Sequence, residues 1–140
     1  MRIRTRAREI ALQYLYQIDI THAHTVETLE EFFTHFVDDK DVVPYARELV
    51  SGVCDSLVLI DSFIEKASEN WKVSRMSTTD RNILRIATYE LAYKPDIPYR
   101  VAINEAIEMA KRFGSPRFPA FANGVLDKVW SEVSARGSTC

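Results

Sequence analysis

The sequence predicts an all-α protein made of two packed three-helix subdomains. Its long segments place apolar residues three and four positions apart, the spacing of one face of a helix. Glycine and proline are scarce, with four and five copies in 140 residues, which disfavours a turn-rich β fold. No segment shows the strand alternation of apolar and polar residues over a useful length. We expect six to seven helices in a single domain, with residues 1–70 forming an N-terminal three-helix bundle and residues 71–140 a C-terminal helical bundle.

The first predicted helix covers residues 1–20 and combines an apolar face with a basic start. The apolar face consists of Ala7, Ile10, Ala11, Tyr14, Leu15 and Ile18. Tyr16 lies about 200° around the helix from Tyr14 and therefore faces away from the core. The basic start holds Arg2, Arg4, Arg6 and Arg8 and no acid. Like charges four residues apart repel, and cations oppose the dipole at a helix N-terminus. We therefore expect an anionic polymer outside the fold to neutralise these arginines.

Two further helices complete the predicted N-terminal half. Thr25 is a plausible N-cap for a helix over residues 26–37, and the charged run at residues 38–41 ends it. Pro44 is tolerated in the first turn of a third helix, whose apolar face continues to Ile64 without interruption. We expect this third helix to be continuous.

The C-terminal half begins with a connection, residues 68–76, that Trp71 is expected to anchor. Ser77 to Asp80 resembles a capping box and opens a fourth helix, which Pro95 and Pro98 end. In that helix Ile83, Leu84, Ala87 and Leu91 are apolar, whereas Arg81, Arg85 and Thr88 are not.

The fifth helix is expected to end at Gly114, and a short rigid loop leads into the sixth. Phe118 and Phe121 bracket the start of this last helix, so one is expected to enter the core while the other stays partly exposed. A glycine inside a helix costs about 1 kcal/mol against alanine, so Gly124 indicates either tight helix packing or close approach of a partner.

Charge is distributed unevenly along the chain, although the total is only −2. Residues 1–8 carry +4, residues 9–70 carry about −10 and residues 71–140 carry +4. Local patches govern the encounter with a polyanion more than the sum does. Arginine donates planar, bidentate hydrogen bonds to phosphate, so the arginine-rich start predicts a nucleic-acid contact, with a solvated N-terminus as the simpler alternative.

Several classes of function are disfavoured. Cys54 and Cys140 do not form a disulfide framework and suit a reducing compartment, and neither a signal peptide nor a membrane span is visible, so we expect a cytoplasmic protein that does not enter a membrane. His22, His24 and His35 lack the spacing of a metal site, and no cofactor is expected. No catalytic or nucleotide-binding motif is present, which predicts that the protein is not an enzyme.

Four stretches of the chain resemble the NusB family of bacterial transcription antitermination factors. They are Arg4–Leu15 (RTRAREIALQYL), Asp80–Leu91 (DRNILRIATYEL), Ile97–Gly114 (IPYRVAINEAIEMAKRFG) and Phe121–Lys128 (FANGVLDK). The resemblance implies a fold of two helical subdomains and an RNA-binding factor without catalysis. It implies binding to the single-stranded boxA element of nascent ribosomal RNA transcripts, as a heterodimer with the ribosomal protein NusE, in an antitermination complex on RNA polymerase.

The resemblance also implies roles for individual residues. The RNA-binding set is Arg4, Arg6, Arg8, Arg117 and Phe121, to which the basic start of the chain adds Arg2, and the NusE-binding set is Tyr16, Asp80, Arg81 and Arg85. Thr5 interrupts the arginines and Ala120 stands where the family can have a basic residue, a charge that Arg117 is expected to supply. Replacing Arg6 or Arg8 by alanine is expected to weaken RNA binding without unfolding the protein.

Two alternatives remain. NusB-like domains also occur as RNA-binding appendages of ribosomal RNA methyltransferases, but such a chain needs an α/β domain for which these 140 residues leave no room unless the sequence is a fragment. The acidic middle and basic ends could instead pair between copies and give a self-associating homodimer.

Overall fold

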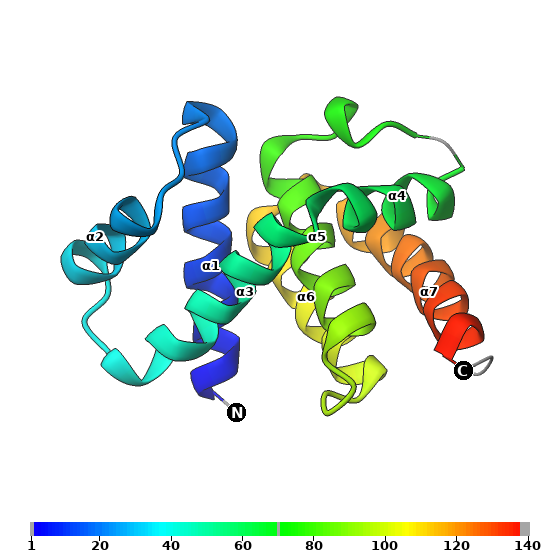
Figure 1. The fold of residues 1–140 in the computed structure, drawn as a ribbon. Helices are drawn as coiled ribbons and strands as arrows, with labels where there is room; N and C mark the ends of the chain where they lie inside the picture. Colours follow the sequence, from blue (N-terminus) through cyan, green and yellow to red (C-terminus); the bar gives the residue numbers. More distant parts are fainter. Residues whose placement is uncertain (1, 70, 138–140) are drawn as a thin grey trace.

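A computed structural model describes residues 2–69 and 71–137, and within these ranges all regular secondary structure is helical, without strands. The α-helices are α1 (Arg2–Thr21), α2 (Val26–Phe36), α3 (Val43–Asp55), α4 (Leu57–Ala67), α5 (Thr78–Tyr93), α6 (Tyr99–Phe113) and α7 (Phe118–Gly137), and two short 3₁₀ helices are η1 (Lys40–Val42) and η2 (Val73–Arg75) (Figure 1). The predicted all-α class is confirmed. No helix in the described part of the chain is long and apolar enough to cross a membrane.

Local sequence explains where the early helices begin. The Thr25 hydroxyl accepts the backbone N–H of Thr28, and the Thr28 hydroxyl accepts the backbone N–H of Thr25, so a capping box opens α2 as the N-cap prediction requires. Pro44 lies in the first turn of α3, as predicted.

The prediction of one continuous helix up to Ile64 is wrong, because the chain turns at Ser56 between α3 and α4. Apolar residues keep helical spacing across this turn, so periodicity cannot detect it. Only packing shows the difference: α3 lies against α1, whereas α4 lies against α5 and α7 (Figure 1).

Helix α5 is the central element, with α1 and α3 on one side and α4, α6 and α7 around the rest (Figure 1). Its polar residues Asn82, Arg85, Thr88 and Glu90 are therefore buried together with its apolar ones. One cluster of buried apolar side chains runs from α1 to α7. The boundary between two subdomains at residue 70 stays a prediction.

Val73, and not Trp71 as expected, anchors the connection before α5. Trp71 is 56% exposed, so it does not anchor this segment. Val73 is buried instead, and its backbone N–H donates to Glu65 Oε2 at 2.9 Å. This anchor fixes the segment while leaving the Trp71 ring at the surface.

Candidate nucleic-acid interface

Carboxylates from the fold itself neutralise the basic start of α1. Arg4 pairs with Asp96 at 3.5 Å, and Arg6 pairs with Glu9 at 3.1 Å. The expectation that only an external anion compensates these charges is therefore wrong for the described side chains. The side chain of Arg2, the first residue of α1, lies outside them.

Arg8 belongs to the core, which corrects its assignment to the RNA-binding set. It is 3% exposed, and its Nε lies 2.9 and 3.1 Å from the two carboxylate oxygens of Glu90 while its Nη1 donates to Glu105 at 2.9 Å. The hydroxyl of Tyr45 also donates to Glu90, and that of Thr5 donates to Glu105 at 2.6 Å. Burial raises the pKa of Glu90, and the charge of Arg8 is the main influence that opposes this rise. The guanidinium of Arg8 has no free face for RNA.

Arg6, by contrast, is at the surface and shares a groove with a second arginine. The groove, of about 370 Å³, lies between α1 and the end of α6, and Arg6, Glu9, Arg112 and Phe113 line it. The side chains of Arg6 and Arg112 are 52% and 58% exposed, and Glu9 pairs with both. We call Arg6, Glu9, Arg112 and Phe113 the arginine groove.

Sequence reasoning missed Arg112. Its guanidinium lies 4.7 Å from the centre of the Phe113 ring, a cation–π contact that holds both side chains at the exposed end of α6. The available cue was a basic residue followed by an aromatic one just before the helix-ending Gly114.

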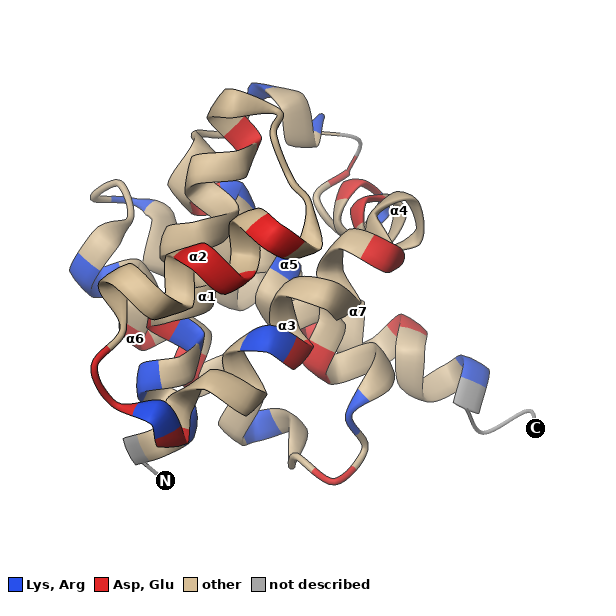
Figure 2. Cartoon of the chain, turned by 60° about the vertical axis from the view of Figure 1, so that its left-hand side comes forward, with Lys and Arg blue, Asp and Glu red and all other residues tan. Residues whose placement is uncertain are grey.

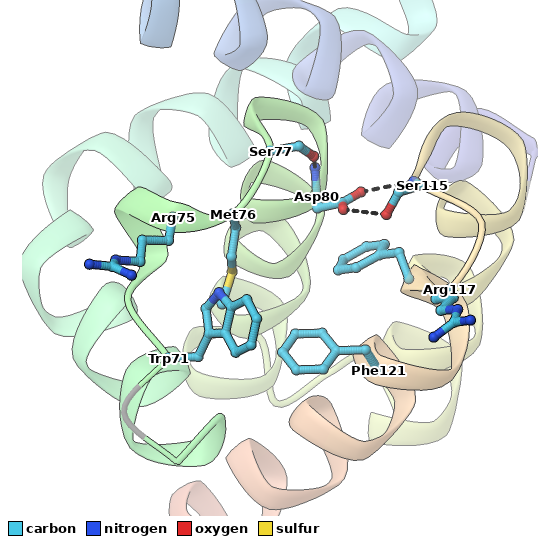
Figure 3. Close-up of a pocket in the computed structure, with 9 residues that line it drawn as sticks. Trp71, Arg75, Met76, Ser77, Asp80, Ser115, Arg117 and Phe121 are labelled. Carbon is cyan, nitrogen blue, oxygen red and sulfur yellow. Dashed lines mark hydrogen bonds between the residues drawn. The ribbon is translucent and has the colours of Figure 1, made fainter.

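A second hollow, of about 430 Å³, lies between the η2 segment and the start of α7. Three aromatic rings (Trp71, Phe118, Phe121), Met76 and two arginines (Arg75, Arg117) are among its lining residues (Figure 3). Phe118 is buried and Phe121 is 37% exposed, which confirms that one ring enters the core and the other does not. We call this hollow the Trp71–Phe121 pocket.

Gly124 lies one turn after Phe121 on α7, and a Cβ atom built there would meet nothing within 4 Å. Tight helix packing therefore does not explain this glycine. Close approach of a partner, the other alternative, stays a prediction.

Asp80 is a tether inside the molecule, which revises its assignment to the partner-binding set. Ser77 caps α5 by accepting the Asp80 N–H, as expected, but the Asp80 carboxylate does not complete the capping box. It accepts the backbone N–H of Ser115 at 3.3 Å and the Ser115 hydroxyl at 2.8 Å (Figure 3). Asp80 is buried, and it ties the start of α5 to the loop that carries Arg117.

Arg81 and Arg85 are also engaged inside the fold. Asp19 Oδ2 on α1 accepts from Arg81 Nε at 2.7 Å, from Asn82 Nδ2 at 2.9 Å and from Arg85 Nη1 at 3.1 Å. Arg85 forms a further two-bonded pair with Asp61, both bonds at 2.9 Å. The partner-binding assignment of Arg85 is therefore revised, because its side chain is buried between two carboxylates.

This network changes the titration of Asp19. Burial by itself would raise the pKa of Asp19, but hydrogen bonds from Arg81 and Asn82 and the charges of Arg85 and Arg81 outweigh it. The net effect holds the pKa of Asp19 below its ordinary value of 3.8.

Tyr16 faces outward as predicted, with 44% of its surface exposed, while Tyr14 is fully buried. Tyr16 lines the arginine groove on one side. On the other side it lines an apolar groove of about 400 Å³ with Ile20, Phe32 and Phe36. Ile20 and Phe36 are exposed as well, so α1 and α2 together present an apolar surface beside the basic one.

The histidine and cysteine side chains that the structure describes do not form a metal site. His24 Nδ1 and Thr28 both hydrogen-bond the hydroxyl of Tyr14, at 2.6 and 2.9 Å. Among residues 2–69 and 71–137 no group of three or more His, Cys, Asp or Glu side chains is arranged to hold a metal ion. Cys54 is a free thiol, and Cys140 lies outside the described residues.

Figure 2 shows acidic positions on α2 and α4 and basic positions near the start of α1 and on α6.

Comparison with known proteins identifies the family of this chain. The sequence profile of the NusB family matches residues 5–131. The chain belongs to the NusB family. The transcription antitermination protein NusB of Desulfatibacillum aliphaticivorans is 48% identical over 126 residues, which cover 90% of this chain and 88% of that protein.

Two solved structures show the same fold as this NusB-family chain. NusB of T. maritima is 38% identical and superposes with a TM-score of 0.82 over 92% of this chain and 91% of that one. A crystal structure of the antitermination factors NusB and NusE in complex with double-stranded RNA includes a chain that is 27% identical. It superposes with a TM-score of 0.83 over 94% of this chain and 98% of that one.

Proposed function

We propose that the chain is a non-enzymatic, RNA-binding transcription antitermination factor that acts in the cytoplasm. It binds the boxA element of nascent ribosomal RNA transcripts as a heterodimer with NusE and helps to assemble an antitermination complex on RNA polymerase. Membership of the NusB family and the solved complex of NusB and NusE with RNA support this proposal. The observation that carries it is the pair of basic, aromatic hollows, the arginine groove and the Trp71–Phe121 pocket.

The proposal divides the surface between two partners. The exposed Arg6 and Arg112 and the exposed Phe121 and Arg117 are suited to phosphates and unpaired bases. Tyr16, with the apolar surface beside it, is suited to a protein, since exposed aromatic residues often anchor protein contacts. Helix α1 carries both Arg6 and Tyr16, so it would hold RNA and NusE in a fixed relation.

A binding titration tests the proposal directly. Fluorescence anisotropy is measured with boxA-type single-stranded RNA, a scrambled strand and a duplex, each with and without NusE. We expect preference for the boxA strand and tighter binding with NusE. Arg6→Ala is expected to weaken binding and to reduce the log–log salt slope by about 0.7, the share of one phosphate contact on a single strand.

Arg136→Ala is the matched control, since Arg136 is also exposed and paired with a carboxylate but lies near the end of α7. This control is expected to bind RNA like the unaltered chain. Equal affinity for boxA and scrambled strands in all conditions would contradict specific recognition, and no RNA binding at all would contradict the function.

Glu9 should restrain RNA binding, because its carboxylate neutralises both Arg6 and Arg112. We expect Glu9→Gln to bind RNA several-fold more tightly and with a steeper salt dependence, since two guanidinium groups become available to phosphates. Glu31→Gln makes the same charge change on the exposed surface of α2 and is expected to have no such effect. Weaker RNA binding by Glu9→Gln, in a variant of unchanged stability, would show that Glu9 does not compete with RNA.

A further inference from the structure

The Trp71–Phe121 pocket has an aromatic and apolar lining that no side chain of the described residues fills. The rings of Trp71 and Phe121 come from the η2 connection and from α7, and their centres lie 6.3 Å apart at 60° (Figure 3). Phe118 and Met76 form its inner wall. Trp71 is the most exposed of the aromatic rings that line the pocket, at 56%, although a tryptophan at the surface of a fold normally covers other apolar groups.

The two arginines of the pocket differ from the described arginines of α1. Within residues 2–69 and 71–137, the side chains of Arg75 and Arg117 have neither a carboxylate nor a hydrogen-bond partner, whereas those of Arg4, Arg6 and Arg8 are all paired. Both are exposed, and their side chains extend to opposite sides of the Trp71 and Phe121 rings (Figure 3). Their charges are thus available to an external anion.

We propose that the Trp71–Phe121 pocket binds one unpaired base of the RNA strand, with Arg75 and Arg117 contacting the phosphates on either side of that nucleotide. The inference rests on the proposed RNA-binding function and adds Trp71 and Arg75 to it. A base stacks on aromatic rings whatever its identity, and a nucleotide within a strand carries a phosphate on each side of its sugar. The two rings are inclined, so the base stacks on the face of one ring with the edge of the other beside it.

A peptide fits this pocket less well than a base does. A peptide backbone needs hydrogen-bond partners, and Asp80, the acidic side chain among the lining residues, already accepts two hydrogen bonds from Ser115. Two unpaired cations beside apolar rings favour an anionic, aromatic ligand.

Both walls of the pocket are held in place without the ligand. The Asp80–Ser115 tether fixes the loop that carries Arg117. The bond from Val73 N–H to Glu65 fixes the segment that carries Trp71 and Arg75. A ligand would therefore bind without first ordering these segments, which favours affinity.

A double-mutant cycle tests the inference. Single-stranded boxA-type RNAs, each with an abasic site at one successive position, are titrated against the unaltered chain and Trp71→Ala, in complex with NusE. One position is expected to lose about tenfold in affinity with the unaltered chain, and this loss is expected to disappear in Trp71→Ala. In a Trp130→Phe background, where Trp71 is the remaining tryptophan, intact RNA should quench its fluorescence and the RNA abasic at that position should not.

Two control variants separate the pocket from general effects. Tyr93→Ala removes a partly exposed aromatic ring at the opposite end of α5 and should leave the abasic profile unchanged. Arg75→Ala and Arg117→Ala should each lower the salt slope by about 0.7, whereas Arg136→Ala should not. Thermal unfolding of each variant checks that the fold is retained, as expected for exposed residues.

The outcomes are distinct. Identical abasic profiles for the unaltered chain and a folded Trp71→Ala would overturn the inference while leaving the proposed function in place. Loss of NusE binding with unchanged RNA binding in Trp71→Ala would show that the pocket takes a protein and would also overturn it. Failure of the unaltered chain to bind any of the RNAs would instead overturn the proposed function itself.

Discussion

Replacement of Arg8 by alanine is expected to destabilise the fold by about 3–5 kcal/mol, a large part of the stability of a domain of this size. The variant leaves the buried carboxylate of Glu90 without its cation and removes a partner of Glu105. Urea unfolding followed by circular dichroism measures the change. This reverses the expectation that Arg8→Ala leaves the fold intact.

Arg6→Ala is the control for this experiment, because Arg6 lies two residues away on the same helix but is exposed. Its free energy of unfolding is expected to change by less than about 0.5 kcal/mol. The double variant Arg8→Met with Glu90→Gln should recover part of the loss, since it removes the unpaired charge of Glu90. An Arg8→Ala variant as stable as Arg6→Ala would contradict the assignment of Arg8 to the core.

Asp19→Asn is expected to destabilise the fold by about 2 kcal/mol at neutral pH, because hydrogen bonds between charged groups are stronger than neutral ones. Asp19 joins α1 to the start of α5 through Arg81, Asn82 and Arg85. Asn82 and Arg81 lose a charged acceptor, while Arg85 keeps Asp61. Chemical unfolding at neutral pH measures the difference.

The same network predicts a dependence on pH. The folded pKa of Asp19 lies below its ordinary value of 3.8, so Asp19 stabilises the fold above that pH and loses this contribution as the pH falls through the folded pKa. Unfolding free energies between about pH 5 and about pH 3 should therefore fall more steeply in the unaltered chain than in Asp19→Asn. Parallel curves for the two proteins would contradict a lowered pKa at Asp19.

The basic start of α1 combines structural and surface roles along a single helix turn. Arg8 is buried against α5 and α6, and Arg6 is exposed in the arginine groove. Under the proposed function, a helix that is fixed by Arg8 presents Arg6 to RNA and Tyr16 to NusE. Changes at Arg8 would then reduce RNA binding through loss of the fold, and only changes at Arg6 would report contact with RNA.

Much of the fold followed from the sequence alone. The all-α class, the Thr25 cap, Pro44 in the first turn of α3 and the outward Tyr16 depend on helical spacing and capping, which are local properties. The sequence also predicted that one of Phe118 and Phe121 enters the core while the other stays partly exposed, and the structure decides that Phe118 is the buried one. The break at Ser56 was not predicted, because the apolar spacing continues across it.

The candidate site was predictable only in part. Arg6, Arg117 and Phe121 were named from the sequence, and the structure finds all three exposed. Arg112 and Trp71 were not assigned to RNA, because Arg112 reaches the groove from α6 and Trp71 reaches the pocket from the η2 segment. Sequence spacing carries no information on such contacts.

The sequence by itself determined which segments are helical, where most of them begin, and that arginines gather at the start of the chain. Only the tertiary structure decided which of these arginine charges remain available to an external ligand. The partners of Arg8 lie 82 and 97 residues away, and Asp19 reaches Arg85 over 66 residues. Whether an arginine pairs within the fold or stays open to a ligand depends on carboxylates from distant helices, and packing around α5 brings these together.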